Sequence, residues 1–154
     1  MLAHINIGSN LGDSRSIIEQ AVAEIFLLSE GECKRSSMIE SEPWGFESSN
    51  SFLNIGVEIE TSLNLEELLD CLQTIERSIS SASHRNEDGS YRDRLIDIDL
   101  IFIAERQTDG CLIGRRYNSH QLTLPHPRAL QRDFVTIPIK QLHPEIADIT
   151  SLLI

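Results

Sequence analysis

Two aspartates lie two positions apart in an otherwise apolar segment, Asp97 and Asp99 within residues 95–103 (LIDIDLIFI). On a β-strand, residues i and i+2 point to the same face about 6.6 Å apart, so both carboxylates would share one face. Their apolar neighbours would form the core side: Ile96, Ile98, Leu100 and Phe102. Two like charges about 7 Å apart repel by roughly 2.4 kcal/mol at an effective dielectric of about 20. Bound Mg²⁺ that also coordinates substrate phosphates would remove this repulsion; two solvated acids on an exposed sheet face are the alternative.

Arginine is concentrated in the second half of the chain. Nine of the 13 basic residues lie between Arg77 and Arg132, and all nine are arginines. Arginine holds phosphate with two parallel hydrogen bonds, and arginines beside paired carboxylates suit phosphoryl transfer. The chain contains neither G-x-x-x-x-G-K-[ST] nor G-x-G-x-x-G, so a nucleotide site would be of another kind. A solvated face with surface ion pairs is the alternative role of these arginines.

Composition and charge exclude several classes of protein. The 154 residues are 40% hydrophobic and 24% charged, which is ordinary for one soluble domain spanning residues 1–154. The net charge of −11 argues against general nucleic-acid binding, because a phosphate backbone requires a basic surface. The apolar runs are too short to span a membrane, and the N-terminus lacks the pattern of a signal peptide. Three widely spaced cysteines without a C-x-x-C pair favour a reducing compartment, so we expect a cytoplasmic monomer with no membrane partner.

Hydrophobic periodicity predicts the order strand, helix, strand, strand, helix, strand. The strands are expected at residues 3–7, 33–41, 53–59 and 95–103, and the helices at 14–28, closed by Gly31, and at 65–79. Asp13 or Ser14 can cap the first helix. Asn64 and Glu67 form a capping box for the second. The third strand alternates apolar residues with Asn54, Gly56, Glu58 and Glu60, so we expect it to be wet on one face.

This order predicts an α+β fold, a ferredoxin-like αβ sandwich with a mostly antiparallel sheet and two helices on one face. The other face is expected to remain available for a site. The C-terminal 50 residues would add a loop, a hairpin or short helices. Gly8 and Gly12 follow the first strand, where a turn is their predicted role.

Seven short segments, taken in order, resemble one known family. They are residues 7–13 (IGSNLGD), 42–46 (EPWGF), 52–54 (FLN), 75–77 (IER), 91–99 (YRDRLIDID), 124–128 (LPHPR) and 132–134 (RDF). The chain resembles the 6-hydroxymethyl-7,8-dihydropterin pyrophosphokinases from about Ile5 to Pro144. The resemblance implies transfer of a diphosphate from ATP to the pterin hydroxymethyl group, giving AMP and the pterin diphosphate in folate biosynthesis. It also implies two Mg²⁺ ions as cofactors.

The resemblance assigns roles residue by residue. Asp97 and Asp99 are implied to hold both metal ions and, with Arg94, to form the catalytic set, to which we add Arg85 for the reason given below. The implied pterin-binding residues are Ser41, Pro43, Trp44, Gly45, Phe52, Asn54, Asp97 and Phe134. The implied nucleotide-binding residues are Gln73, Glu76, Tyr91, Arg94, Leu100, Thr123, His126 and Arg132.

The chain departs from the family pattern after the second predicted helix. The family carries Gly-Arg there, whereas residues 80–85 read SSASHR. We expect Arg85 to reach the same phosphates as the missing arginine.

Less specific interpretations remain open for single residues and for the whole chain. Phe52 and Phe134 could be core residues, Glu76 a solvated surface acid, and His126 part of a turn. The chain could also be a degenerate homologue that binds nucleotide or pterin without turnover. A third possibility is a ferredoxin-like regulatory module without nucleotide chemistry.

Overall fold

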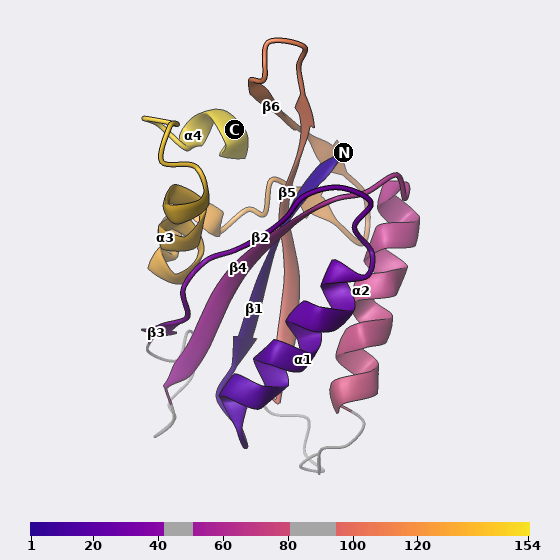
Figure 1. The fold of residues 1–154 in the computed structure, drawn as a ribbon, viewed down its shortest axis with the longest axis vertical. Helices are drawn as coiled ribbons and strands as arrows, with labels where there is room; N and C mark the ends of the chain where they lie inside the picture. Colours follow the sequence, from indigo (N-terminus) through magenta and orange to yellow (C-terminus); the bar gives the residue numbers. More distant parts are fainter. Residues whose placement is uncertain (42–50, 81–94) are drawn as a thin grey trace.

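An antiparallel sheet forms the centre of the molecule (Figure 1). The computed structural model describes residues 1–41, 51–80 and 95–154. The sheet strands are β1 Leu2–Ser9, β2 Cys33–Arg35, β3 Ile39–Ser41, β4 Phe52–Glu60, β5 Asp97–Arg106 and β6 Leu112–Arg115. Their order is β2-β4-β1-β5-β6, with β3 also paired to β4. The central strand β1 therefore lies between β4, which contains Asn54, and β5, which contains Asp97 and Asp99.

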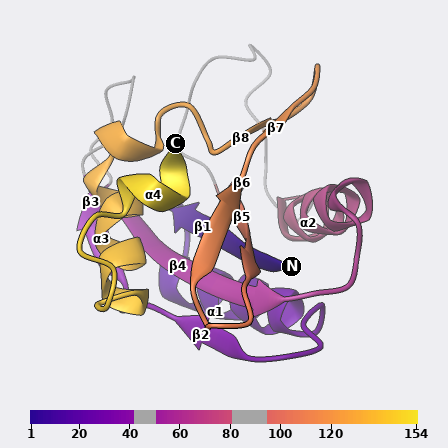
Figure 2. The same cartoon turned by 90° about the horizontal axis from the view of Figure 1, so that it is seen from above.

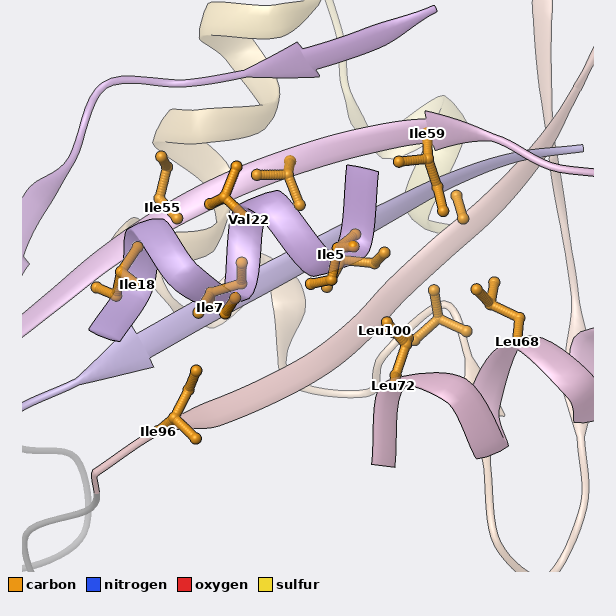
Figure 3. Close-up of a cluster of buried hydrophobic side chains, with 14 of the residues drawn as sticks. Ile5, Ile7, Ile18, Val22, Ile55, Ile59, Leu68, Leu72, Ile96 and Leu100 are labelled. Carbon is orange, nitrogen blue, oxygen red and sulfur yellow. The ribbon is translucent and has the colours of Figure 1, made fainter. Parts of the chain in front are cut away.

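Two helices cover one face of the sheet, as predicted. They are α1 Ser14–Phe26 and α2 Leu65–Ser80, and their apolar stripes meet alternate residues of β1, β4 and β5 in a first core (Figure 3). Its members include Ile5, Ile7, Ile18, Val22, Ile55, Ile59, Leu68, Leu72, Ile96 and Leu100. This core fixes α2 beside β5, where α2 supplies residues to the site described below.

The ends of these helices test the predicted caps. Asp13 is the N-cap of α1, with its side chain accepting from the Ser16 N–H at 3.3 Å. The Asn64 side chain accepts from the Glu67 N–H at 2.9 Å and the Glu67 side chain accepts from the Asn64 N–H at 3.0 Å, which confirms the capping box of α2. The predicted closure of α1 at Gly31 is wrong: the helix ends at Phe26, because Glu30 already donates its N–H to Glu60 O of β4 at 2.8 Å.

The predicted strand at residues 33–41 is divided into β2 and β3, which both pair with β4. Ser36 stands at the break: its N–H donates to Gly56 O and its hydroxyl accepts from the Gly56 N–H, each at 2.9 Å. The Ser36 hydroxyl oxygen thus replaces a backbone carbonyl as the acceptor for the Gly56 N–H.

The second face of the sheet is covered over β4 and β5, contrary to expectation. The helices α3 Asp133–Leu142 and α4 Thr150–Leu153, with the 3₁₀ turn η1 Ala129–Gln131, pack there in a second core (Figure 2). Asn54 is 3% exposed and Glu58 1% exposed, so the prediction that this face of β4 is wet is wrong. The alternation of polar residues along β4 was predicted correctly. The helices that cover the polar face come from a C-terminal segment more than 70 residues away in the chain.

A β-bulge in β5 reverses which residues face the first core. His4 of β1 pairs with Phe102 while Ile5 pairs with Leu100, so Ile101 is the extra residue. Leu100 accordingly packs in the first core and Phe102 in the second, and the prediction that both share one side is wrong. The Ile101 carbonyl accepts from the His126 N–H at 2.7 Å. The bulge therefore also fixes the backbone of a candidate site residue.

The remaining described elements are a two-stranded ladder of β7 Tyr117–Asn118 and β8 Thr123–Leu124. Within the three described segments, none of the helices combines the length and the apolarity that a membrane span requires.

Candidate active site

Three neighbouring strands place amide and carboxylate side chains on one face of the sheet. Gly8 of β1 pairs with Asn54 on one side and with Asp97 on the other. Asn6 pairs in the same way with Gly56 and Asp99. Residues directly opposite in an antiparallel sheet project to the same face, so these are two parallel rows, Asn54–Gly8–Asp97 and Gly56–Asn6–Asp99. Both aspartates are half-buried on the second face, next to each other as period-2 geometry requires.

Gly8 allows a close approach in the middle of its row. A Cβ built there would lie 2.8 Å from Asn54 Oδ1 and 3.6 Å from Phe52 Cδ1. The residue lies inside β1, so its predicted role in a turn is wrong; Gly12, with φ of 70°, does occupy the turn. Asn54 donates through Nδ2 to the Ser41 hydroxyl at 2.8 Å. We call this row the Gly8 floor: an amide and a carboxylate stand on either side of a residue without a side chain.

A cleft of about 420 Å³ opens beside this floor. It contains five of the nucleotide-side residues that the family resemblance implies, together with both aspartates: Gln73, Glu76, Leu100, Thr123 and His126 with Asp97 and Asp99. The cleft therefore brings together residues from α2, β5, β8 and the segment after it.

Several cleft residues were not predicted from the sequence. Leu69, His120, Gln121 and Leu122 also line it. For Leu69 a signal existed, because Leu69, Gln73 and Glu76 are spaced i, i+4 and i+7 on one face of α2. For residues 120–122 no local pattern indicates that they reach α2. Asn6 was also missed: it is 5% exposed, and its Oδ1 has no hydrogen-bond partner among the described residues.

Glu76 holds the edge of β5 between the two aspartates. Its Oε2 accepts from the Ile98 N–H at 2.8 Å, and the residue is half-buried. The interpretation of Glu76 as a solvated surface acid is therefore wrong. Through this bond Glu76 attaches α2 to the part of β5 that contains both aspartates.

His126 lies between positive and negative groups. Burial lowers the pKa of its imidazole, and the charges of Arg132 and Arg128 lower it further against the opposing effect of Asp97. Its Nδ1 accepts from the Arg128 N–H at 3.2 Å, so the neutral ring carries its proton on Nε2. A neutral imidazole of this kind can donate a hydrogen bond to a phosphate oxygen.

Arg132 and Phe134 form the beginning of α3. The Arg132 guanidinium carbon lies 5.6 Å from the centroid of the Phe134 ring, and Phe134 packs against the second core. Phe52 and Phe134 are both half-buried, so each retains ring surface that a flat ligand can contact. The remaining residues implied by the resemblance lie outside the described residues: Pro43, Trp44, Gly45, Arg85, Tyr91 and Arg94.

The donor set suits a cation that completes its coordination with substrate oxygens. Nowhere in residues 1–41, 51–80 and 95–154 are three or more His, Cys, Asp or Glu side chains grouped to hold a metal ion. The rows provide two carboxylates and the amide oxygens of Asn6 and Asn54 as oxygen donors. Mg²⁺ commonly binds through one or two carboxylates together with phosphates and water, so the residues present fit Mg²⁺ bound with a phosphate substrate.

Comparison with known proteins extends the agreement over nearly the whole chain. Residues 4–144 match the family model of 7,8-dihydro-6-hydroxymethylpterin-pyrophosphokinase. The chain belongs to this family. A 2-amino-4-hydroxy-6-hydroxymethyldihydropteridine pyrophosphokinase of Porphyromonas gingivalis is 35% identical to it over 94% of this chain and 95% of the relative. The Bacillus subtilis enzyme of the same name is 34% identical over 94% of this chain and 80% of the relative.

A solved structure shows the same fold. It is described as an HPPK-DHPS in complex with substrates, and it aligns with a TM-score of 0.60 over 94% of this pyrophosphokinase-family chain at 14% identity. The chain spans 40% of the length of that structure's chain.

Proposed function

We propose that this member of the pyrophosphokinase family transfers a diphosphate from ATP to 6-hydroxymethyl-7,8-dihydropterin, giving AMP and the pterin diphosphate in folate biosynthesis. One observation carries the proposal beyond the family match: Asp97 belongs both to the Asn54–Gly8–Asp97 row and to the lining of the 420 Å³ cleft. A single carboxylate thus borders a floor suited to a flat polar ring and a cleft suited to a nucleotide.

The pterin would lie on the Gly8 floor. The Asn54 amide offers both donor and acceptor atoms, which suits the mixed edge of a pterin. Phe134 and Phe52 are the aromatic side chains available for stacking against the ring. In this placement the hydroxymethyl group would lie towards Asp97, and the lack of a side chain at Gly8 would let the ring approach the strand.

The ATP would lie in the cleft between α2 and the segment 119–127. Leu69, Leu72 and Leu100 supply apolar surface and Gln73 and Thr123 supply polar groups for the nucleoside. His126 and Arg132 would contact the phosphates. Asp97 and Asp99 would hold the two Mg²⁺ ions, which would supply positive charge against the phosphates.

The residues then promote an in-line displacement at the β-phosphorus. A bond forms between the hydroxymethyl oxygen and the β-phosphorus as the bond to the bridging α,β-oxygen breaks, so AMP leaves and the hydroxyl loses its proton. Asp97 orients the hydroxyl group, and His126 and Arg132 stabilise the charge that develops on the phosphoryl oxygens. We also assign Arg94 to this role on the family resemblance, and Arg85 as a substitute for the arginine that the family carries after the second helix.

We further infer a ferredoxin-like description of the sheet and a cytoplasmic, monomeric, single-domain protein over residues 1–154. The sheet order β2-β4-β1-β5 supports the first inference. The three thiols of Cys33, Cys71 and Cys111 are unpaired, which suits a reducing compartment. Helices from the same chain pack on both faces of the sheet, which supports a monomer.

The test is AMP formation from ATP, Mg²⁺ and 6-hydroxymethyl-7,8-dihydropterin, with pterin-free and EDTA controls. We expect Asp97→Asn and Asp99→Asn to lower kcat by at least about a hundredfold, because each removes a group that acts on transition-state charge. Glu105→Gln is the matched control: it lies on the same strand, outside the cleft, in an ion pair with Arg115 at 3.8 Å.

The outcomes separate three interpretations of the chain. AMP that appears only with both pterin and metal, and that is lost in the aspartate variants alone, supports the proposal. Tight ATP or pterin binding without AMP would instead identify a homologue that binds without turnover. Absence of Mg²⁺-dependent ATP binding would indicate a regulatory module.

A further inference from the structure

Three ionisable side chains are buried together in the second core, away from the cleft. The Oε1 atom of Glu58 lies 2.7 Å from His4 Nδ1 and 2.8 Å from His143 Nε2. The exposed fractions are 0% for His4, 1% for Glu58 and 2% for His143. We call these three residues the buried cluster. Removing charge from water is costly and is often not repaid by the ion pair itself, so such a cluster in an apolar core invites a functional explanation.

The buried cluster continues the rows of the candidate site. His4 pairs with Glu58 on one side and Phe102 on the other, in the row after Gly56–Asn6–Asp99. The His4 ring stacks on Phe102 with centroids 5.1 Å apart. Glu58 lies four residues from Asn54 along β4, or about 13 Å. The cluster therefore shares a sheet face and two strands with the proposed pterin floor without touching it.

His143 joins this row to the end of α3. It is the C-cap residue of the helix, with its N–H donating to Ile139 O at 2.9 Å. Two further contacts hold the same half of α3. Pro138 lies so close to β4 that a Cβ on Gly56 would be 2.6 Å from its Cβ. The Gln141 Oε1 atom accepts from the Ser37 N–H and hydroxyl, each at 3.0 Å.

The opposite end of α3 carries the proposed pterin and phosphate contacts. Phe134 lies in the first turn and Arg132 is the N-cap, and a ten-residue helix is about 15 Å long. Attachment of the C-terminal half to β4 therefore sets where the Phe134 ring lies relative to Asn54, which belongs to the same strand.

We propose that Glu58 and His143 are positioning residues for the pterin subsite, which by fixing the end of α3 on β4 place Phe134 against the Asn54–Gly8–Asp97 row. This inference rests on the proposed function for the identity of the ligand. It assigns a role to two residues that lie outside the cleft and take no part in the transfer chemistry.

The ionic character of the attachment makes the placement of Phe134 dependent on pH. The groups that face His143 are Glu58 from β4, His4 from β1 and Glu145 two residues on, whose carboxylate is also influenced by Lys34 of β2. Burial lowers the pKa of His143, but the hydrogen bonds and charges of Glu58 and Glu145 outweigh it and raise the pKa above 6.5. As the pH rises through that raised pKa, His143 loses its charge and the attachment weakens.

The experiment compares His143→Gln, which keeps a donor without charge, with His143→Leu, which keeps neither. Calorimetry from pH 6 to 9 measures the dissociation constants of 6-hydroxymethyl-7,8-dihydropterin and of a non-hydrolysable ATP analogue. Amide hydrogen exchange of residues 134–137 reports on the beginning of α3. Val22→Ala, in the first core on the other face, is the control for a loss of stability alone.

The proposal predicts different effects on the two ligands. Wild-type pterin affinity should fall about tenfold as the pH rises through the His143 pKa, and His143→Gln should remove this dependence. His143→Leu should weaken pterin binding more than His143→Gln does and speed exchange at residues 134–137. It should lower affinity for the ATP analogue to a smaller extent, because Arg132 is the one proposed ATP contact at the beginning of α3.

Two results would overturn the positioning role. One is that His143→Leu and Val22→Ala lose affinity to the same extent, and each for both ligands equally. This would show that the cluster contributes only to stability. The other is unchanged exchange at residues 134–137 in His143→Leu. If the wild-type chain bound no pterin at all, the proposed function would fail instead, and the exchange data would still decide whether His143 positions the beginning of α3.

Discussion

Gly8 shows how much of the site depends on the absence of one methyl group. It stands between Asn54 and Asp97 on the central strand, and a Cβ there would meet the Asn54 amide and the Phe52 ring. A side chain at this position would occupy the floor on which we place the pterin. The conformational freedom of glycine is not required here, since Gly8 has no positive φ; the close approach of Asn54 is what requires glycine.

We therefore predict that Gly8→Ala weakens pterin binding. The new Cβ would approach Asn54 Oδ1 to 2.8 Å, so the amide must turn away from its bond to Ser41. The dissociation constant for pterin should rise at least about tenfold, which corresponds to one hydrogen bond of about 1.4 kcal/mol, while that for the ATP analogue stays constant.

Gly110→Ala is the control for this variant. Gly110 has φ of 88° and no atom within 4 Å of a built Cβ, so alanine there costs about 1 kcal/mol of stability without reaching the site. Pterin affinity that is unchanged in Gly8→Ala, or lowered equally in both variants, would contradict the assigned floor.

At the scale of elements, α2 and β5 together determine the geometry of the aspartate pair. The helix contributes Gln73 to the cleft, and its Glu76 bonds to the Ile98 N–H on β5. The start of α2 is fixed separately, by the reciprocal bonds of Asn64 and Glu67. Gln73 and Glu76 lie nine or more residues beyond Asn64, so the effects of the cap and of these two residues can be measured independently.

We predict that Asn64→Ala lowers the free energy of unfolding by about 1 kcal/mol, the usual value of an N-cap side chain. Urea denaturation measures the change. Glu66→Gln, an exposed acid in the same first turn, should cost only a few tenths of a kcal/mol, because it loses a helix-dipole interaction without losing a cap. AMP formation at 25 °C should be the same in both variants as in the wild type; a lower kcat in Asn64→Ala alone would show that the cap also shapes the cleft.

At the scale of the whole molecule, the sheet separates two cores of different character. The first core is formed by apolar side chains of α1, α2 and the sheet, whereas the buried cluster lies on the side of the second core. Burial raises the pKa of Glu58, but hydrogen bonds from His143 and His4 outweigh it and lower the pKa from 4.5 to about 2. The pKa of His143 is shifted the other way, above 6.5, so both members of the pair favour the charged state in the folded protein.

These shifts predict a pH window for stability. The contribution of Glu58, about 3 kcal/mol, is present above its unfolded-state pKa of 4.5 and is lost as the pH falls towards 2. The contribution of His143 is complete below 6.5 and is lost as the pH rises through its raised pKa. The advantage of wild type over the double variant Glu58→Gln/His143→Gln should therefore be greatest between pH 4.5 and 6.5.

Urea midpoints of both proteins from pH 3 to 9 test this window. Val22→Ala provides a control of lowered stability with an intact cluster, and its difference from wild type should not vary with pH. A wild-type advantage over the double variant that is constant from pH 3 to 9 would show that protonation of the cluster is not linked to folding.

The sequence by itself determined the features that depend on local geometry. The shared face of Asp97 and Asp99 follows from the period of two in a strand, and the capping box of α2 from contacts three residues apart. The ordered motifs, from residues 7–13 to residues 132–134, were sufficient to indicate the family that residues 4–144 match.

Tertiary structure decided the features that depend on contacts between distant segments. The alternation in β4 correctly put Asn54 and Glu58 on one face, but α3 determines that this face is buried. The extra residue Ile101 reverses the alternation and moves Phe102 to the second core, and its carbonyl accepts from His126 in a distant segment, a contact that residues 95–103 do not reveal. Likewise, the histidines that hold Glu58 come from positions 54 residues before it and 85 residues after it. Periodicity specifies the direction of a side chain from its own strand or helix, whereas its partner is fixed only when the whole chain has packed.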